Sequence, residues 1–359
     1  MKKIGIICEY NPFHNGHIYH INKIKEMFED SIIIAVMSGN FTQRGIPSIL
    51  SKEEKTKIAL NNNIDLVIEL PTIYSTQSAD TFAYGAISIL KQLKVDYLVF
   101  GSENNDIENL TNLAKFQLNN KNYQEKVKDY LNEGLNYPTA MSKALGYSIN
   151  TPNDLLGLSY IKAIIKLNAS IIPLTIKRTN DFHSLELDNS ICSATAIRAA
   201  ITNNKDISKY VPKEVELILK DKKDIDILPL LKYKIISEGT SISKYLTVDE
   251  GIENRIIKVI NKCNSLDELI KMIKTKRYTY NKLSRMFIHI LCSITKEYAI
   301  NNKEIKYIRI LGFNNKGQKI LNKIKKEVTV PLIVNTKYYK ELLKDEIKID
   351  KIYELISTT

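Results

Sequence analysis

Short apolar runs alternate with helical patterns along the first 200 residues. Five runs predict strands, at residues 3–8, 32–37, 64–70, 95–100 and 171–176, with helices between them. One of these helices opens on a capping box of Ser51 and Glu54 and closes at the asparagines of 61–63. Such alternation predicts an α/β fold in which helices cover both faces of a Rossmann-like parallel sheet.

Beyond residue 200 the apolar positions change to helical spacing. Residues 250–263 and 280–298 predict helices, and a short mixed segment predicts strands at 305–311 and 330–335 around a helix at 315–327. A chain of 359 residues also exceeds the usual size of one compact unit. We therefore expect two domains, an α/β domain at 1–205 and a mainly α-helical basic domain at 206–359.

The composition is that of an ordinary globular protein, with 44% hydrophobic and 26% charged residues. The apolar run after Lys2 and Lys3 ends at Glu9, which is too short for a signal sequence or a membrane span. We expect a cytoplasmic protein with no membrane contact. Its four cysteines form no C-x-x-C pair, so we expect reduced thiols and no metal site built by the protein.

The net charge of +12 comes from the second part of the chain alone. Residues 1–200 hold 20 basic and 20 acidic side chains, whereas residues 201–359 hold 32 and 20. Residues 251–326 are the densest section, with 18 basic and 5 acidic side chains. This asymmetry favours a polyanionic partner such as nucleic acid, and the alternative is a lysine-rich composition without a binding role.

The first predicted strand is followed at once by two histidines at H-x-G-H spacing, His14 and His17. Gly16 removes a side chain where a phosphate would approach the backbone at a helix start. Both imidazoles can donate N–H groups to the α-phosphate of ATP while a nucleophile attacks it, so the pattern predicts adenylyl transfer. The alternative is a surface turn without a ligand, with His20 as a packing residue and Cys8 in the core.

Further polar residues follow the other strands of the sheet, whose carboxyl ends share one rim. Ser193, Thr195 and Arg198 open a helix and can hold the β- and γ-phosphates, or can be a simple helix cap with a solvated arginine. Arg178, next to Thr179, follows the last strand and can pair with phosphate or lie at the surface. Asn153 can bind adenine or ribose, or cap a helix.

The loop after the second strand contains Asn40, Gln43 and Arg44, which can hold a small carboxylate or the base to be modified, or can be structural. In the basic part, residues 276–285 interleave tyrosines with cations. Their predicted RNA-binding residues are Lys276, Arg277, Tyr278, Lys282 and Arg285, because tyrosine stacks on unpaired bases and cations bind phosphates. The alternative is a solvated helix face with the tyrosine in the core.

These motifs together resemble the bacterial tRNA(Met) cytidine acetate ligase family, a branch of the H-x-G-H nucleotidyltransferase superfamily. The resemblance spans the chain, at residues 9–17, 37–45, 65–71, 100–103, 193–198, 277–279 and 311–314. It implies that the first motif wraps ATP through Ile7, Cys8, Glu9, Tyr10, Asn11, Pro12, Phe13, His14, Asn15, Gly16, His17, Ile18, Tyr19 and His20. It also implies that Gly101, Asn153 and Arg178 complete the nucleotide pocket. One departure is that Cys192 and Ala194 replace an isoleucine and a serine of the superfamily's phosphate motif.

The resemblance implies an enzyme that uses ATP and Mg²⁺ to activate acetate as acetyl-adenylate. The acetyl group then passes to the wobble cytidine of elongator tRNA(Met), giving N4-acetylcytidine. Two other functions stay open at this point. One is a nucleotidyltransferase that joins ATP to a small phosphate ester to make a dinucleotide cofactor, and the other is an RNA-binding protein that has lost its activity.

Overall fold

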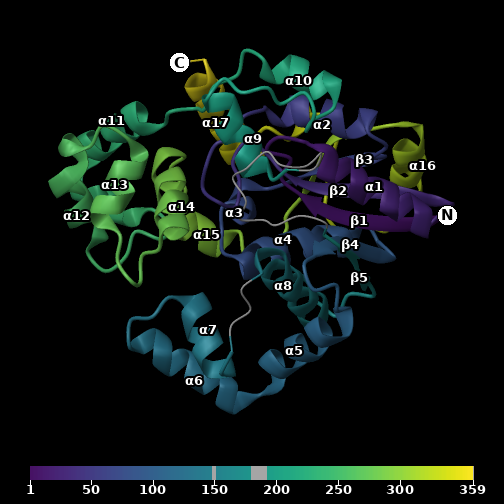
Figure 1. The fold of residues 1–359 in the computed structure, drawn as a ribbon, viewed down its shortest axis with the longest axis horizontal. Coiled ribbons are helices and arrows are strands. Elements are labelled where there is room, and N and C mark those ends of the chain that lie inside the picture. The colour runs from purple at the N-terminus through teal and green to yellow at the C-terminus, as the bar shows by residue number, and fades with distance from the viewer. Residues whose placement is uncertain (148–150, 179–191, 359) are drawn as a thin grey trace.

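The centre of the protein is a seven-stranded sheet with the strand order β5-β4-β1-β2-β3-β6-β7 (Figure 1). The computed structural model describes residues 1–147, 151–178 and 192–358. The strands are β1 (Lys2–Cys8), β2 (Ser31–Ser38), β3 (Leu66–Leu70), β4 (Tyr97–Ser102), β5 (Ile172–Lys177), β6 (Ile308–Phe313) and β7 (Leu332–Ile333). All five strands predicted in the first 200 residues are confirmed, and they pair in parallel.

The sheet is apolar on both faces because helices cover both. Every residue of β2 is buried, and its side chains alternate between two cores. Ile33 and Ala35 pack on one face, against α1 (Asn15–Met27), α2 (Lys52–Asn61), α9 (Ala194–Thr202) and α10 (Lys213–Leu219). Ile32 and Ile34 pack on the other, against α4 (Ala79–Gln92) and α8 (Pro152–Lys166).

Two groups of helices extend beyond this sheet. Between β4 and α8 the chain forms a small lobe of α5 (Ile107–Asn119), α6 (Lys121–Asn132) and α7 (Tyr137–Leu145), drawn below the sheet in Figure 1. The second group, the helical unit, comprises α11 (Leu228–Glu238), α12 (Ile252–Val259), α13 (Leu266–Ile273), α14 (Tyr280–Leu291) and α15 (Lys296–Asn301). The remaining α-helices are α3 (Thr72–Ser75), α16 (Asn315–Ile324) and α17 (Lys344–Ser357). None of the helices in the described ranges is long and apolar enough to cross a bilayer.

The predicted helix at 280–298 is wrong in extent, since the structure divides it into α14 and α15. Ser293 has a φ of 59°, in the left-handed region, which ends the first helix. The hydroxyl of Thr295 then accepts from the backbone N–H of Tyr298 at 3.0 Å and caps the next helix. Apolar spacing continues across this break, which is why the hydrophobic pattern did not reveal it.

The sheet does not stop at the predicted domain boundary of 205/206. The predicted strands near 305–311 and 330–335 exist as β6 and β7, and β6 pairs antiparallel with β3 while β7 pairs parallel with β6. The sheet is therefore mixed, and part of the segment assigned to the helical domain completes the α/β unit.

A buried ion-pair network holds this C-terminal segment on the sheet. Lys52 on α2 pairs with Glu69 on β3 at 2.8 Å and with Asp350 on α17. Arg309 on β6 lies 2.9 Å from Glu69 and 3.0 Å from Asp350. The side chains of Lys52 and Glu69 are only 1% and 3% exposed, so neither charge can be solvated if its partner is lost.

We predict that Glu69→Gln destabilises the protein by about 3–5 kcal/mol, because it leaves Lys52 and Arg309 with an uncompensated buried charge. Urea denaturation measures the free energy of unfolding. The matched control is Glu327→Gln, which breaks the exposed pair of Lys94 and Glu327. It should cost less than about 1 kcal/mol. Equal losses in the two variants would contradict the role given to the network.

Candidate active site

A cavity of about 1180 Å³ lies at the carboxyl ends of β1, β4 and β5. This is larger than the roughly 300–1,000 Å³ of a typical small-molecule site, so it has room for a nucleotide and part of a second substrate. Most predicted site residues line it: Ile7, Cys8, Glu9, Tyr10, Asn11, His14, Gly16, His17, Tyr19, His20, Gln43, Arg44, Gly101, Asn153, Arg178, Ser193, Thr195, Arg198, Arg277, Lys282 and Arg285. The fold therefore brings together residues that are up to 278 positions apart in the sequence.

The two histidines of the H-x-G-H motif form the start of α1. Nδ1 of His14 accepts from the backbone N–H of Gly16 at 3.0 Å, and Nδ1 of His17 accepts from the backbone N–H of His14 at 3.1 Å. Together these bonds make a capping box built from imidazoles. The two rings lie side by side, with their centroids 3.8 Å apart and an interplanar angle of 32°.

This capping box fixes the tautomer of both rings. A nitrogen that accepts a hydrogen bond carries no proton, so the proton of each neutral ring is on Nε2. Burial, with a smaller contribution from the nearby Arg178, lowers the pKa of His14 to about 3. Burial and the neighbouring His14 likewise hold the pKa of His17 well below its usual range. At neutral pH the site therefore presents two preorganised neutral N–H donors.

The phosphate motif at the start of α9 gains a second arginine from a different loop. Arg44 donates to the hydroxyl of Thr195 at 2.9 Å, and Arg198 donates to the same hydroxyl at 3.4 Å and to the backbone carbonyl of Asn11. Burial and the neighbouring Arg44 lower the pKa of Arg198. Ser193 caps the helix by accepting from the N–H of Ala196 at 3.1 Å. Two cations around one hydroxyl suit the charge of a polyphosphate.

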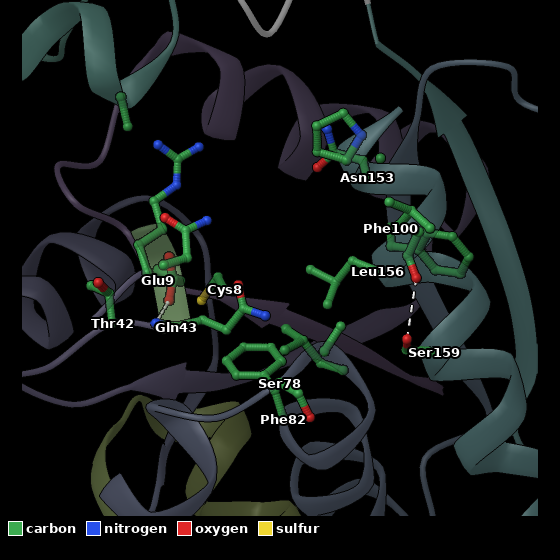
Figure 2. Close-up of a pocket in the computed structure, with 18 of the residues that line it drawn as sticks. Cys8, Glu9, Thr42, Gln43, Ser78, Phe82, Phe100, Asn153, Leu156 and Ser159 are labelled. Carbon is green, nitrogen blue, oxygen red and sulfur yellow. Dashed lines mark hydrogen bonds between the residues drawn. The ribbon is translucent and has the colours of Figure 1, made fainter. Parts of the chain in front are cut away.

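The opposite side of the cavity is formed by the ends of β4 and β5. An added Cβ on Gly101 would lie 3.3 Å from the Arg178 side chain, so the glycine lets that arginine cross the strand. The amide of Asn153 donates to Glu103 at 2.5 Å, which orients the side chain. Figure 2 shows Asn153, Phe100 and Leu156 across the cavity from Glu9 and Gln43. On this side the apolar side chains of Phe100 and Leu156 suit a planar ring and lie beside the polar Asn153, while the side with Glu9 and Gln43 is polar.

Several predicted residues lie elsewhere. Asn40, expected to bind a substrate, is 5% exposed and does not line the cavity. Its carbonyl accepts from the N–H of Lys52 at 2.9 Å and its amide donates to Asp350 at 3.1 Å, so it belongs to the ion-pair network. This corrects its predicted substrate role. Four residues of the first motif also lie outside the lining, namely Pro12, Phe13, Asn15 and Ile18. Thr179 lies outside the described residues.

The residues of the predicted RNA-binding segment differ in their burial and contacts. Tyr278 is 4% exposed and its hydroxyl donates to the backbone carbonyl of Asp249 at 2.7 Å, which contradicts the expected stacking on bases. Its ring instead lies 4.0 Å below the ammonium of Lys282. Arg277 pairs with Glu250 and donates to the carbonyl of Leu131 at 3.1 Å. Lys276 is exposed outside the cavity.

Sequence reasoning missed several parts of the cavity wall, among them residues of α8 and two segments at helix starts. One is the segment from Gln77 to Asp80 at the start of α4, and the other is the start of α7, with Asn136 and Tyr137. The first follows β3 closely enough that the rule on carboxyl ends of parallel strands would have identified it. No local signal marks the second, because only the folding of the small lobe brings it to the cavity.

The whole chain matches proteins of one family. A family model described as HIGH Nucleotidyl Transferase matches residues 1–359. A tRNA(Met) cytidine acetate ligase of Clostridium tetani is 40% identical, covering 99% of this chain and 96% of that protein. One from Thermoanaerobacter sp. (strain X514) is also 40% identical, covering 96% and 91%. Two crystal structures of Thermotoga maritima TmcAL, each 30% identical, are similar in fold. The apo form has a TM-score of 0.88 over 99% of this chain and 92% of that one, and the form bound with alpha-thio ATP has 0.89 over 100% and 95%.

We predict that the ligand-free protein loses stability as the pH falls from 7.5 to 5.5. An unfolded histidine takes up a proton below about pH 6.5, whereas folded His14 stays neutral to about pH 3, so acid favours the unfolded state. Urea denaturation at the two pH values measures this loss. His14→Asn should make the loss smaller by about 1 kcal/mol, since one titrating group is removed. An unchanged loss in that variant would contradict a neutral His14.

Proposed function

This chain belongs to the HIGH nucleotidyl transferase family, and on that premise we propose that it is an ATP-dependent tRNA(Met) cytidine acetate ligase. Acetate attacks the α-phosphorus of ATP, pyrophosphate leaves, and acetyl-adenylate forms. The N4 amine of the wobble cytidine of elongator tRNA(Met) then attacks the acetyl carbon, and AMP leaves. The observation that carries the proposal is that one cavity is lined by the paired histidine donors, by Arg44 and Arg198, and by the basic residues Arg277, Lys282 and Arg285.

In the first step the histidine pair stabilises negative charge as it develops. The Nε2–H groups of His14 and His17 are set by backbone hydrogen bonds before the substrate arrives, so no reorganisation is needed during reaction. Backbone N–H groups at the start of α1 add positive potential beside them. Arg44, Thr195 and Arg198 hold the departing pyrophosphate.

We propose that Mg²⁺ enters as part of the nucleotide substrate. In residues 1–147, 151–178 and 192–358, no group of three or more His, Cys, Asp or Glu side chains is arranged to hold a metal ion. Mg²⁺ in such sites commonly keeps several waters and binds substrate phosphates with only one or two protein carboxylates, so the ion can arrive on the polyphosphate.

The second step needs no nucleophilic side chain, because the amine of the cytidine attacks the mixed anhydride directly. Cys8 is the cysteine of the cavity lining, and burial raises the pKa of its thiol to about 12. A thiol that stays protonated at neutral pH is a poor nucleophile, so acetyl transfer through this cysteine is not supported.

The experiment that tests this function uses the protein with ATP, ¹⁴C-labelled acetate and total tRNA, followed by digestion to nucleosides. We expect the label in N4-acetylcytidine, and His14→Ala or His17→Ala should lower the rate of acetate-dependent pyrophosphate release about a hundredfold or more. The control is Asn15→Ala, which lies between the histidines but donates to the carbonyl of Lys209 and should keep its rate. Label in no nucleoside, or wild-type rates in both histidine variants, would refute the proposal.

We also predict that tRNA binding is electrostatic and salt-sensitive. The side chain of Lys276 is exposed, and that of Lys282 forms a cation-π pair with Tyr278. The double variant Lys276→Ala/Lys282→Ala should therefore fold. It should weaken tRNA binding and reduce the slope of log K against log salt by about 2, one for each lost phosphate contact. Filter binding at several salt concentrations measures the slope. The control is Lys319→Ala/Lys323→Ala on α16, outside the cavity lining, which should leave the slope of log K against log salt unchanged.

A further inference from the structure

Among the residues that the structure describes, two carboxylates, Glu9 and Asp80, line the cavity together with many cations. Glu9 is engaged within the protein, because its carboxylate accepts from the backbone N–H of Gln43 at 2.6 Å and from the hydroxyl of Ser38 at 3.5 Å. Asp80 lies in the first turn of α4, on the side of the cavity that faces the small lobe. A carboxylate at this position disfavours phosphate and instead suits a ligand group that donates a hydrogen bond.

The carboxylate of Asp80 is fixed in place and keeps its charge. It pairs with Nζ of Lys162 at 2.7 Å and accepts from the hydroxyl of Tyr137 at 3.1 Å. Burial opposes its ionisation, but these two partners and Ser159 outweigh it and lower the pKa of Asp80 below its usual value. The Asp80 side chain is 32% exposed, so part of it still faces solvent in the cavity.

Tyr137 connects this carboxylate to the basic segment. Its side chain is 42% exposed although its hydroxyl is bonded to Asp80, so the ring is open to a ligand. The preceding residue, Asn136, donates to the backbone carbonyl of Lys276 at 3.3 Å. An exposed aromatic ring and a fixed carboxylate therefore lie next to the segment whose cations Arg277, Lys282 and Arg285 line the same cavity.

We propose that Asp80 and Tyr137 select the target cytosine, with Asp80 accepting a hydrogen bond from the N4 amine and Tyr137 stacking on the base. This inference rests on the proposed function and deepens it by naming the groups that recognise the second substrate. Cytosine presents a donor at N4, which a carboxylate recognises, whereas uracil presents an acceptor there and is repelled. Unpaired bases of RNA loops are commonly bound by such stacking on an aromatic side chain.

Asp80 acts here as a positioning residue. The N4 lone pair forms the new bond to the acetyl carbon, the anhydride C–O bond breaks with its electrons on the AMP phosphate, and one N4 proton leaves to water. A hydrogen bond from the second N4 proton to Asp80 holds the amine in line during this attack. The adenylation step does not involve the target cytosine, so it does not need this carboxylate.

The test separates the two half-reactions in Asp80→Asn. Acetate-dependent exchange of pyrophosphate into ATP, measured without tRNA, should stay within about twofold of wild type. Single-turnover transfer from acetyl-adenylate to tRNA should fall roughly ten- to hundredfold. Wild-type protein should also bind the tRNA more tightly than a transcript with uridine at the target position, and the variant should lose this preference.

A second pair of variants controls for a folding defect caused by the loss of the Lys162–Asp80 ion pair. Tyr137→Phe keeps the ring and should transfer acetyl within a few-fold of wild type, whereas Tyr137→Ala should lose transfer as strongly as Asp80→Asn. Normal transfer in both Asp80→Asn and Tyr137→Ala, or an equal fall of exchange and transfer, would overturn the inference. Wild-type protein without acetate-dependent exchange would instead overturn the proposed function.

Discussion

The buried ion-pair network of Lys52, Glu69, Arg309 and Asp350 is the constraint on which the architecture depends. It joins α2, β3, β6 and α17, which are far apart in the sequence, across the antiparallel end of the sheet. Because each charge needs its partners in the same place, the C-terminal segment has one position against the sheet. That segment follows directly on the helical unit, so the network also limits where the unit can lie relative to the active-site rim.

The arrangement of the two histidines depends on a smaller set of hydrogen bonds at the start of α1. The same imidazole nitrogens that cap the helix cannot carry a proton, so formation of the helix start also sets the tautomer of His14 and His17. Burial keeps both rings neutral in the free protein. A bound polyphosphate would favour their protonation, and the neutral state avoids the cost of burying two positive charges before the ligand arrives.

Three parts of the chain supply different residues to the cavity lining. The sheet rim supplies the histidines and Arg178, the small lobe supplies Asn136 and Tyr137, and the helical unit supplies Arg277 and Lys282. Hydrogen bonds join the lobe to the helical unit, such as the bond from Arg277 to the carbonyl of Leu131 and the bond from Asn136 to the carbonyl of Lys276. The side proposed for the nucleotide is thus built on the sheet rim, while the side proposed for RNA lies where the lobe and the helical unit meet.

The five parallel strands and the nucleotide motif could be predicted because their information is local. An unbroken apolar run such as β2 needs cover on both faces, and H-x-G-H after a strand places two rings at a helix start. Asn40 and Tyr278 were assigned wrongly because the sequence does not distinguish a polar or aromatic side chain that contacts a ligand from one that contacts a buried partner in the protein. The pairing of β6 with β3, the approach of Arg44 to Thr195 and the position of Tyr137 beside Asp80 all join distant segments. Such contacts depend on packing in three dimensions, and no spacing along the chain encodes them.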